Sequence, residues 1–198
     1  MVKSARRSRA FSLDAVMPDL QAAWDFLENS DLVAGAGEIQ QAMERLAAEI
    51  TQALSREYPL VLVVMGGAVV FAGQMLPKLR FPMDFDYMHA TRYGAAIRGG
   101  GIDWKVTPPE DVRGRMVLVL DDILDGGETL RAISDRLLAL GASKVYCAVL
   151  VEKTLLRAKP ITADFVGLRI PDRFVFGCGM DAKGYWRNLP EIRAIKEP

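Results

Sequence analysis

The sequence predicts an α/β fold in which a mostly parallel central sheet is flanked by helices. Apolar runs rich in valine occupy residues 60–65 and 116–120, and such runs are typical of strands that are covered on both faces. Strands alternate with helical segments from about residue 60 to 152, which is the pattern of βαβ units. The 198 residues are 51% hydrophobic and 25% charged, which suits a single globular domain with a sizeable core.

Two helices are predicted before the first of these strands. Residues 13–28 are amphipathic, with Pro18 early in the run. Residues 38–56 carry apolar side chains at spacings of three and four, and this longer helix should end at Tyr58-Pro59. The basic N-terminus, MVKSARRSRAF, lacks the apolar segment of a signal peptide, and no apolar run is long enough to span a bilayer. We therefore expect a cytoplasmic protein.

The alternation of strands and helices places the candidate site. We expect, in chain order, a strand at 60–65, a helix at about 68–79, a strand at 83–89, a loop at 90–101, a short strand at 102–106, a strand at 116–122, a helix at 129–140, and strands at 145–152 and 163–168. The tail, 170–198, has no clear period. Ligands of such sheets bind beyond the carboxyl ends of the strands, where glycine-rich and acidic segments occur here.

Charge and cysteine content exclude several classes of protein. Lys+Arg and Asp+Glu both count 25, so the net charge offers no argument for nucleic acid or an anionic membrane as a partner. The chain has two cysteines and one histidine, without a CxxC pair, which makes a structural zinc site very unfavourable. Cys147 lies in an apolar run and is interpreted as a core residue, and His89 is interpreted as structural.

The segment VLVLDDILDGGETL, residues 117–130, carries the strongest chemical signal. Its strand ends in Asp121-Asp122, and two adjacent carboxylates suit ribose hydroxyls or a hydrated magnesium ion. Gly126-Gly127 permits a tight turn with exposed N–H groups, and the following helix adds its positive end. An ordinary turn with solvated acids is the alternative, but three acids, two glycines and Thr129 together favour a phosphate site. Neither a Walker loop nor a GxGxxG fingerprint occurs.

This segment resembles the signature of type I phosphoribosyltransferases, which bind phosphoribosyl pyrophosphate. In that family, an acid at the position of Asp125 is typical of members that act on 6-oxopurines, whereas Gly126 replaces the more usual Thr or Ser. The resemblance implies a type I phosphoribosyltransferase fold in a single domain, residues 1–198. Its core would span about 36–168, and a small hood would come from about 1–35 and 169–198.

Three segments near the C-terminus, 152–158, 164–181 and 184–190, resemble hypoxanthine-guanine phosphoribosyltransferases. The resemblance implies that Lys153 donates to the purine 6-oxo group, which suits a side chain with three donors and no acceptor. It also implies further purine contacts from Phe174, which stacks on the base, from the backbone of Val175, and from Asp181, which acts through a magnesium-bound water.

Two upstream segments resemble the same family. Met65-Gly66-Gly67 corresponds to a pyrophosphate loop with a non-proline cis peptide before the glycine pair, although the family often has lysine where this chain has Met65. The sequence ATRYG resembles a catalytic flap, in which Tyr93 matches the family's tyrosine and Arg92 replaces a serine.

The implied reaction moves 5-phosphoribosyl from phosphoribosyl pyrophosphate to N9 of hypoxanthine or guanine, giving IMP or GMP and pyrophosphate. Asp125, as general base, and Tyr93 would be catalytic. Mg²⁺ would be the cofactor, held by Asp121, Asp122 and Asp181. The residues implied to bind phosphoribosyl pyrophosphate are Met65, Gly66, Gly67, Asp121, Asp122, Asp125, Gly126, Gly127, Glu128, Thr129, Arg157 and Arg187.

The resemblance also implies a homodimer or homotetramer. Two alternatives stay open at the level of sequence: a xanthine-preferring transferase, and a regulator that senses phosphoribosyl pyrophosphate without catalysis. Such regulators commonly carry an added winged-helix domain, and the roughly 57 residues before the first core strand are too few for one in addition to the helices predicted there.

Overall fold

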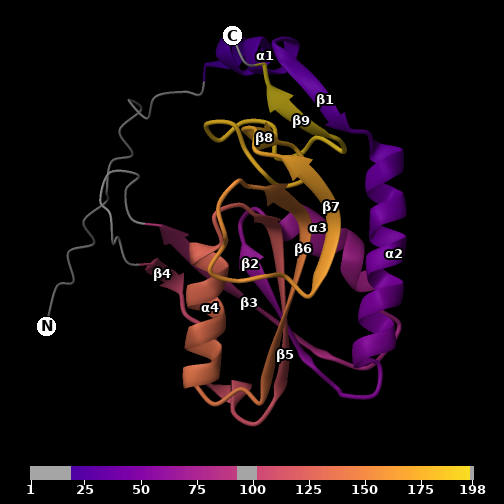
Figure 1. Cartoon of the computed structure of the whole chain (residues 1–198), viewed down its shortest axis with the longest axis vertical. Helices are drawn as coiled ribbons and strands as arrows, with labels where there is room; N and C mark the ends of the chain where they lie inside the picture. The colour runs from indigo at the N-terminus through magenta and orange to yellow at the C-terminus, as the bar shows by residue number, and fades with distance from the viewer. Residues whose placement is uncertain (1–18, 93–101, 197–198) are drawn as a thin grey trace, which may run out of the picture.

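A six-stranded sheet forms the centre of the computed structural model, which describes residues 19–92 and 102–196 (Figure 1). In spatial order the strands are β4 (Ile102–Val106), β3 (Asp84–Arg92), β2 (Leu60–Met65), β5 (Met116–Leu124), β6 (Lys144–Thr154) and β7 (Phe165–Pro171). All neighbouring pairs are parallel except β3 and β4. The prediction of an α/β fold with a mostly parallel sheet is confirmed.

Helices cover both faces of this sheet at its centre, and this explains why the central strand β2 is apolar along its whole length. Val61 and Val63 of β2 pack with residues of α2 (Ala36–Leu54) and α3 (Val69–Met75). The alternate residues of β2, such as Leu62, pack on the other side with α4 (Glu128–Ala139). Because successive side chains of a strand point to opposite faces, a strand buried on both sides must be apolar at every position.

A second, three-stranded sheet joins the two ends of the chain. β1 (Ser30–Ala34) and β8 (Val175–Phe176) both pair antiparallel with β9 (Ile192–Ile195), which lies between them. The sequence predicted none of these short strands, because each is completed only by partners far away along the chain. The small sheet lies beyond the carboxyl ends of β6 and β7 (Figure 1).

The first helix and the tail pack against this small sheet. α1 (Leu20–Glu28) contributes the carbonyl of Ala23, which accepts a hydrogen bond of 2.5 Å from the indole N–H of Trp186. The rings of Trp24 and Trp186 meet edge to face, with centroids 5.0 Å apart. These contacts attach a segment near the N-terminus to the tail that carries several candidate site residues.

Most predicted boundaries agree with the structure within a few residues. The helix predicted over 13–28 agrees with α1 from Leu20 on, since Asp19 is its extended N-cap and residues 13–18 lie outside the described residues. β3 extends through Arg92 into the segment predicted as a loop. Cys147 and Cys178 are buried and free, and burial raises the pKa of the Cys147 thiol to about 12, so this side chain stays neutral in the core. Two 3₁₀ turns complete the elements, η1 (Leu76–Lys78) and η2 (Glu110–Val112). No helix of the described segments is long and apolar enough to cross a membrane.

Candidate active site

The phosphate loop predicted from the sequence lies where β5 ends and α4 begins. Gly127 is the N-cap of α4 and has a φ of 92°, a left-handed conformation that favours glycine. A Cβ on Gly126 would lie 2.3 Å from a carboxylate oxygen of Glu128, so a larger residue there would have to displace the Glu128 side chain. The N-terminus of α4, which is the positive end of the helix dipole, faces a cavity, as an anion site requires.

A cavity of about 360 Å³ opens at this point, between the ends of β2, β3 and β5. It brings together eleven of the twelve residues that the sequence singled out for phosphoribosyl pyrophosphate, and they are Met65, Gly66, Gly67, Asp121, Asp122, Asp125, Gly126, Gly127, Glu128, Thr129 and Arg187. Arg157 is the exception. It does not line the cavity, but it forms an ion pair of 3.4 Å with Glu128, which does.

A second cavity, of about 200 Å³, adjoins the first. Its lining includes all four residues that the sequence singled out for the purine, namely Lys153, Phe174, Val175 and Asp181. The two cavities share Asp122, Ile123, Asp125 and Arg187. A ligand with a phosphate in the first cavity and a flat ring in the second would thus pass directly over Asp122 and Asp125.

The two acids at the end of β5 lie against the glycine loop that follows β2. A Cβ on Gly67 would lie 1.8 Å from Asp122 Oδ2, so only glycine fits beside this carboxylate. Burial raises the pKa of Asp121 well above the ordinary carboxyl value, and the neighbouring charge of Asp122 raises it further. Burial also raises the pKa of Asp122. Buried, closely spaced carboxylates favour a cation between them or a shared proton.

The glycine loop itself has the conformation that the resemblance implied. The peptide bond between Met65 and Gly66 is cis. The tail packs closely on the loop, since a Cβ on Gly179 would lie 1.8 Å from the carbonyl oxygen of Gly67. Gly179 has a φ of 101°, and its own carbonyl accepts a hydrogen bond of 2.7 Å from Arg187. The tail thereby holds Arg187 over the cavity.

Lys153 and Asp125 form the polar side of the smaller cavity. The Lys153 ammonium lies 3.0 Å from Asp125 Oδ2 and 3.5 Å from Asp172 Oδ1. Lys153 is only 8% exposed, and a buried ammonium needs such partners because burial of an unpaired charge is costly. The ammonium therefore has a defined position at the edge of the cavity.

The carboxylates do not form a complete metal cage. In the described part of the chain, no three His, Cys, Asp or Glu side chains converge on one point. Asp181 is separate from the pair on β5, because it forms an ion pair with Arg187 and accepts a hydrogen bond of 2.6 Å from the Gly184 N–H. Two neighbouring carboxylates nevertheless suit Mg²⁺, which keeps several waters and takes further oxygen ligands from phosphate.

The structure also brings in residues that sequence reasoning missed. His89, Ala90 and Thr91, at the end of β3, line the larger cavity, and Met180 lines the smaller one. His89 was interpreted as structural, but it pairs with Met65 in the register of β2 and β3 and so lies at the same edge of the sheet. The position of His89 at a strand end was the available signal. Tyr93 lies outside the described residues.

A glycine turn at a helix N-terminus, two adjacent acids and an adjoining cavity are typical of α/β proteins that bind a nucleotide or a sugar phosphate. Comparison with known proteins agrees. Residues 35–183 match the family model described as a phosphoribosyl transferase domain.

Individual relatives of the chain are also phosphoribosyltransferases. The chain is 32% identical over 161 residues to a hypoxanthine-guanine phosphoribosyltransferase of Streptococcus pneumoniae, covering 81% of this chain and 89% of that protein. It is 33% identical over 161 residues to the enzyme of that name from Bacillus subtilis, covering 80% and 89%. A hypoxanthine phosphoribosyltransferase structure from Staphylococcus aureus matches with a TM-score of 0.79 and 27% identity, covering 86% of this chain and 94% of that one. The chain belongs to the phosphoribosyltransferase family and is an enzyme of this type, as the motif at 117–130 indicated.

Proposed function

We propose that the protein is a purine salvage enzyme that transfers 5-phosphoribosyl from phosphoribosyl pyrophosphate to N9 of hypoxanthine or guanine. The products are IMP or GMP and pyrophosphate. The observation that carries this proposal is the junction of the two cavities at Asp122 and Asp125. One cavity has the phosphate loop and the other has Lys153 and Phe174, so the sugar would lie between them.

The smaller cavity suits a 6-oxopurine. The Lys153 ammonium has only donors, so it would donate to a 6-oxo group and would offer no acceptor to the amino group of adenine. The Phe174 ring is 54% exposed in a wall of this cavity, which leaves a face free for stacking on the base. The backbone of Val175 is the proposed contact for the edge of the base.

The larger cavity suits phosphoribosyl pyrophosphate. The N–H groups of residues 126–129 would hold the 5-phosphate, with Thr129 adding a hydroxyl donor. Asp121 and Asp122 would hold the ribose hydroxyls. The loop of Met65, Gly66 and Gly67 would contact pyrophosphate through its N–H groups, together with Arg187 and with Arg157 after it leaves Glu128. These contacts orient the sugar before any bond changes.

Asp125 is the proposed general base. In the reaction the bond from ribose C1 to the pyrophosphate oxygen breaks and a bond from C1 to N9 forms. The proton lost from the imidazole ring of the purine moves to the Asp125 carboxylate. Asp125 lines both cavities, and this supports the role, because a ligand that spans them would bring its base close to this carboxylate. Tyr93 and its flap would exclude water from the reacting sugar.

Mg²⁺ is the proposed cofactor. Asp121 and Asp122 would hold it directly or through the ribose oxygens, and Asp181 would bind magnesium through water. When bound, the metal neutralises charge on the departing pyrophosphate. We further propose a single catalytic domain, residues 1–198, in which the small sheet serves as the hood, and a cytoplasmic homodimer or homotetramer.

One assay tests the proposal against its alternatives. Purified protein is mixed with phosphoribosyl pyrophosphate and each of hypoxanthine, guanine, xanthine and adenine, with and without Mg²⁺, and nucleotide formation is measured. We expect IMP and GMP to form only with Mg²⁺, and no AMP. Efficient formation of XMP alone would indicate a xanthine-preferring enzyme. Binding of phosphoribosyl pyrophosphate without any nucleotide product would indicate a sensor.

A further inference from the structure

We propose that Lys159 is a positioning residue that sets the geometry of the base-recognition pair Lys153 and Asp125. This inference rests on the proposed function, because it assigns Lys159 a role in how that site holds a purine. Lys159 lies on the segment after β6 and lines neither cavity. Its side chain is nevertheless only 9% exposed, which is unusual for a lysine.

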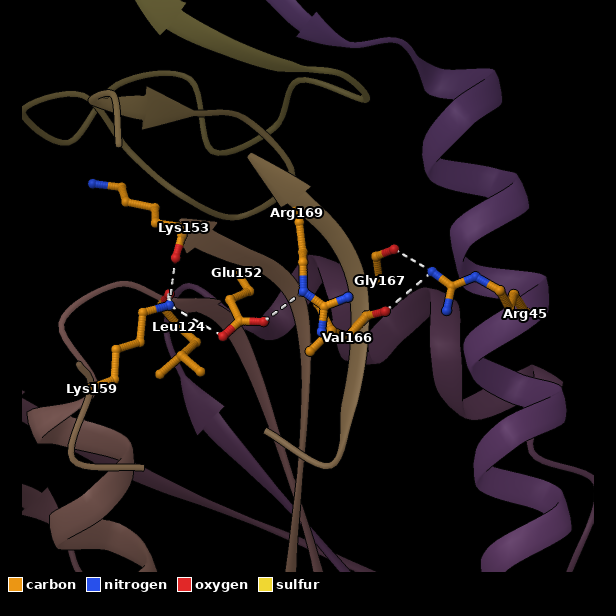
Figure 2. Close-up of polar contacts among 8 residues, drawn as sticks. All are labelled: Arg45, Leu124, Glu152, Lys153, Lys159, Val166, Gly167 and Arg169. Atoms are coloured by element: carbon orange, nitrogen blue, oxygen red, sulfur yellow. Dashed lines mark hydrogen bonds and ion pairs between the residues drawn. The ribbon is translucent and has the colours of Figure 1, made fainter. Parts of the chain in front are cut away.

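The three donors of the Lys159 ammonium match three acceptors around it. It donates to the backbone oxygen of Lys153 at 2.5 Å and to that of Leu124 at 3.2 Å. Its third partner is Glu152 Oε1, at 3.3 Å. Figure 2 shows the ammonium at the centre of these contacts, and Arg169 reaches the other oxygen of Glu152 at 3.2 Å. A buried ammonium is stable only when its donors are satisfied in this way.

Two of these acceptors are backbone oxygens at or next to the base-recognition pair. The Leu124 carbonyl is part of the peptide group that leads into Asp125, and the Lys153 carbonyl belongs to Lys153 itself. The paired register of β5 and β6 ends at Leu124 and Glu152. Lys159 therefore ties the two strands together just where their own register stops. The side chain of Lys153 extends away from Lys159, so the contact is with its backbone alone (Figure 2).

This arrangement has a direct consequence for purine binding. The distance between the Lys153 ammonium and the Asp125 carboxylate is 3.0 Å, and it depends on how the ends of β5 and β6 are held relative to each other. Both groups are proposed to contact the same base, one at the 6-oxo group and one at the imidazole. Loss of the Lys159 ammonium would loosen both positions at once. A displacement of the order of an ångström is sufficient to weaken such a site considerably.

The chain offers a matched control in Arg45. Its guanidinium, from α2, donates to the backbone oxygens of Val166, at 3.1 Å, and Gly167, both in the edge strand β7 (Figure 2). Arg45 is thus also a cation that holds the carbonyls of a strand, but it lies away from both cavities. Removal of either cation lowers stability, whereas only removal of Lys159 should alter the base site.

The experiment compares Lys159→Met and Arg45→Met with the wild-type protein. Calorimetry measures the Kd of IMP, which has a base and a phosphate, and of ribose 5-phosphate, which has no base. Steady-state assays measure KM for hypoxanthine, and thermal unfolding checks folding. For Lys159→Met we expect IMP affinity and hypoxanthine KM to worsen on the order of tenfold, with ribose 5-phosphate affinity kept within about twofold. For Arg45→Met the two Kd values and the KM for hypoxanthine should all stay within about twofold of the wild-type values.

Two results would overturn the proposal. The first is that Lys159→Met weakens the binding of IMP and of ribose 5-phosphate equally, which would indicate general disruption of the site. The second is that a folded Lys159→Met variant binds IMP with unchanged affinity. Failure of the proposed function is seen separately, as the absence of nucleotide formation by the wild-type protein. In that case the two Kd values still decide the role of Lys159, because binding of IMP does not require turnover.

Discussion

The Lys153 ammonium lies 3.0 Å from the Asp125 carboxylate, and this contact joins the ends of two neighbouring strands. Lys153 belongs to β6, and Asp125 is the first residue after β5. The pair lies in the wall of the smaller cavity, so a purine placed there would meet a donor and a proton acceptor together. Each partner can be changed separately, and the effects should differ.

Asp125→Asn should lower kcat by about ten- to a thousandfold, because the amide cannot accept the imidazole proton. The change preserves shape, and the amide oxygen can still accept a hydrogen bond from Lys153. The KM for phosphoribosyl pyrophosphate should therefore stay nearly unchanged. Steady-state kinetics with each substrate varied in turn measure both quantities. Unchanged turnover would exclude Asp125 as the general base.

Lys153→Met should reduce kcat/KM for hypoxanthine by roughly ten- to a hundredfold, because the 6-oxo group loses its donor. Discrimination against adenine should fall with it. The variant keeps the length and the apolar stem of the side chain. Because 55% of the Asp125 side chain is exposed, water can replace the ammonium of Lys153 as its partner. Competition assays with hypoxanthine and adenine measure the ratio. An equal loss on the phosphoribosyl pyrophosphate side would contradict the assigned role.

Gly67→Ala should reduce activity more than about tenfold, because the new Cβ would lie 1.8 Å from Asp122 Oδ2 and must displace that carboxylate. Gly73→Ala is the matched control. Gly73 lies within α3, and a Cβ there meets nothing within 4 Å. It should retain wild-type activity and gain about 0.5–1 kcal/mol of stability, as expected for alanine in a helix. Similar activity in the two variants would show that the position of Asp122 does not matter.

Asp121→Asn should raise the thermal stability of the metal-free protein at about pH 7. Because burial raises the pKa of Asp121 in the folded protein, the folded state binds more protons than the unfolded state above the ordinary Asp pKa of about 3.9. Wild-type stability therefore falls as the pH rises from that value through the raised pKa. The asparagine variant lacks this loss, so its advantage in Tm should shrink as the pH approaches about 4.

A series of thermal unfolding curves between about pH 4 and pH 8 tests this expectation. Asp111→Asn serves as the control, since the side chain of Asp111 is 70% exposed, and its change should stay within about 0.5 kcal/mol at every pH. A lower Tm of Asp121→Asn than of wild type at neutral pH would contradict the account of a destabilising buried charge.

Much of the site could be predicted because its parts are local in sequence. The strand, the acids, the glycine turn and the helix start of residues 117–130 are consecutive, and each has a physical use that can be recognised without the fold. The apolar run of β2 likewise predicts a strand covered on both sides. In contrast, the pairing of β1 with β9 involves the two ends of the chain, and neither short strand has a period of its own.

By itself, the sequence determined the α/β class, and it predicted the candidate phosphate loop and the residue types proposed to contact a purine. Only the tertiary structure decided how these parts combine: that the cavities meet at Asp122 and Asp125, that His89 lies in the wall of one of them, and that Lys159 ties the strands beneath the base-recognition pair. The physical reason is that local conformation depends on neighbours along the chain. The position of a buried ammonium such as Lys159 depends instead on acceptors that other segments bring to it.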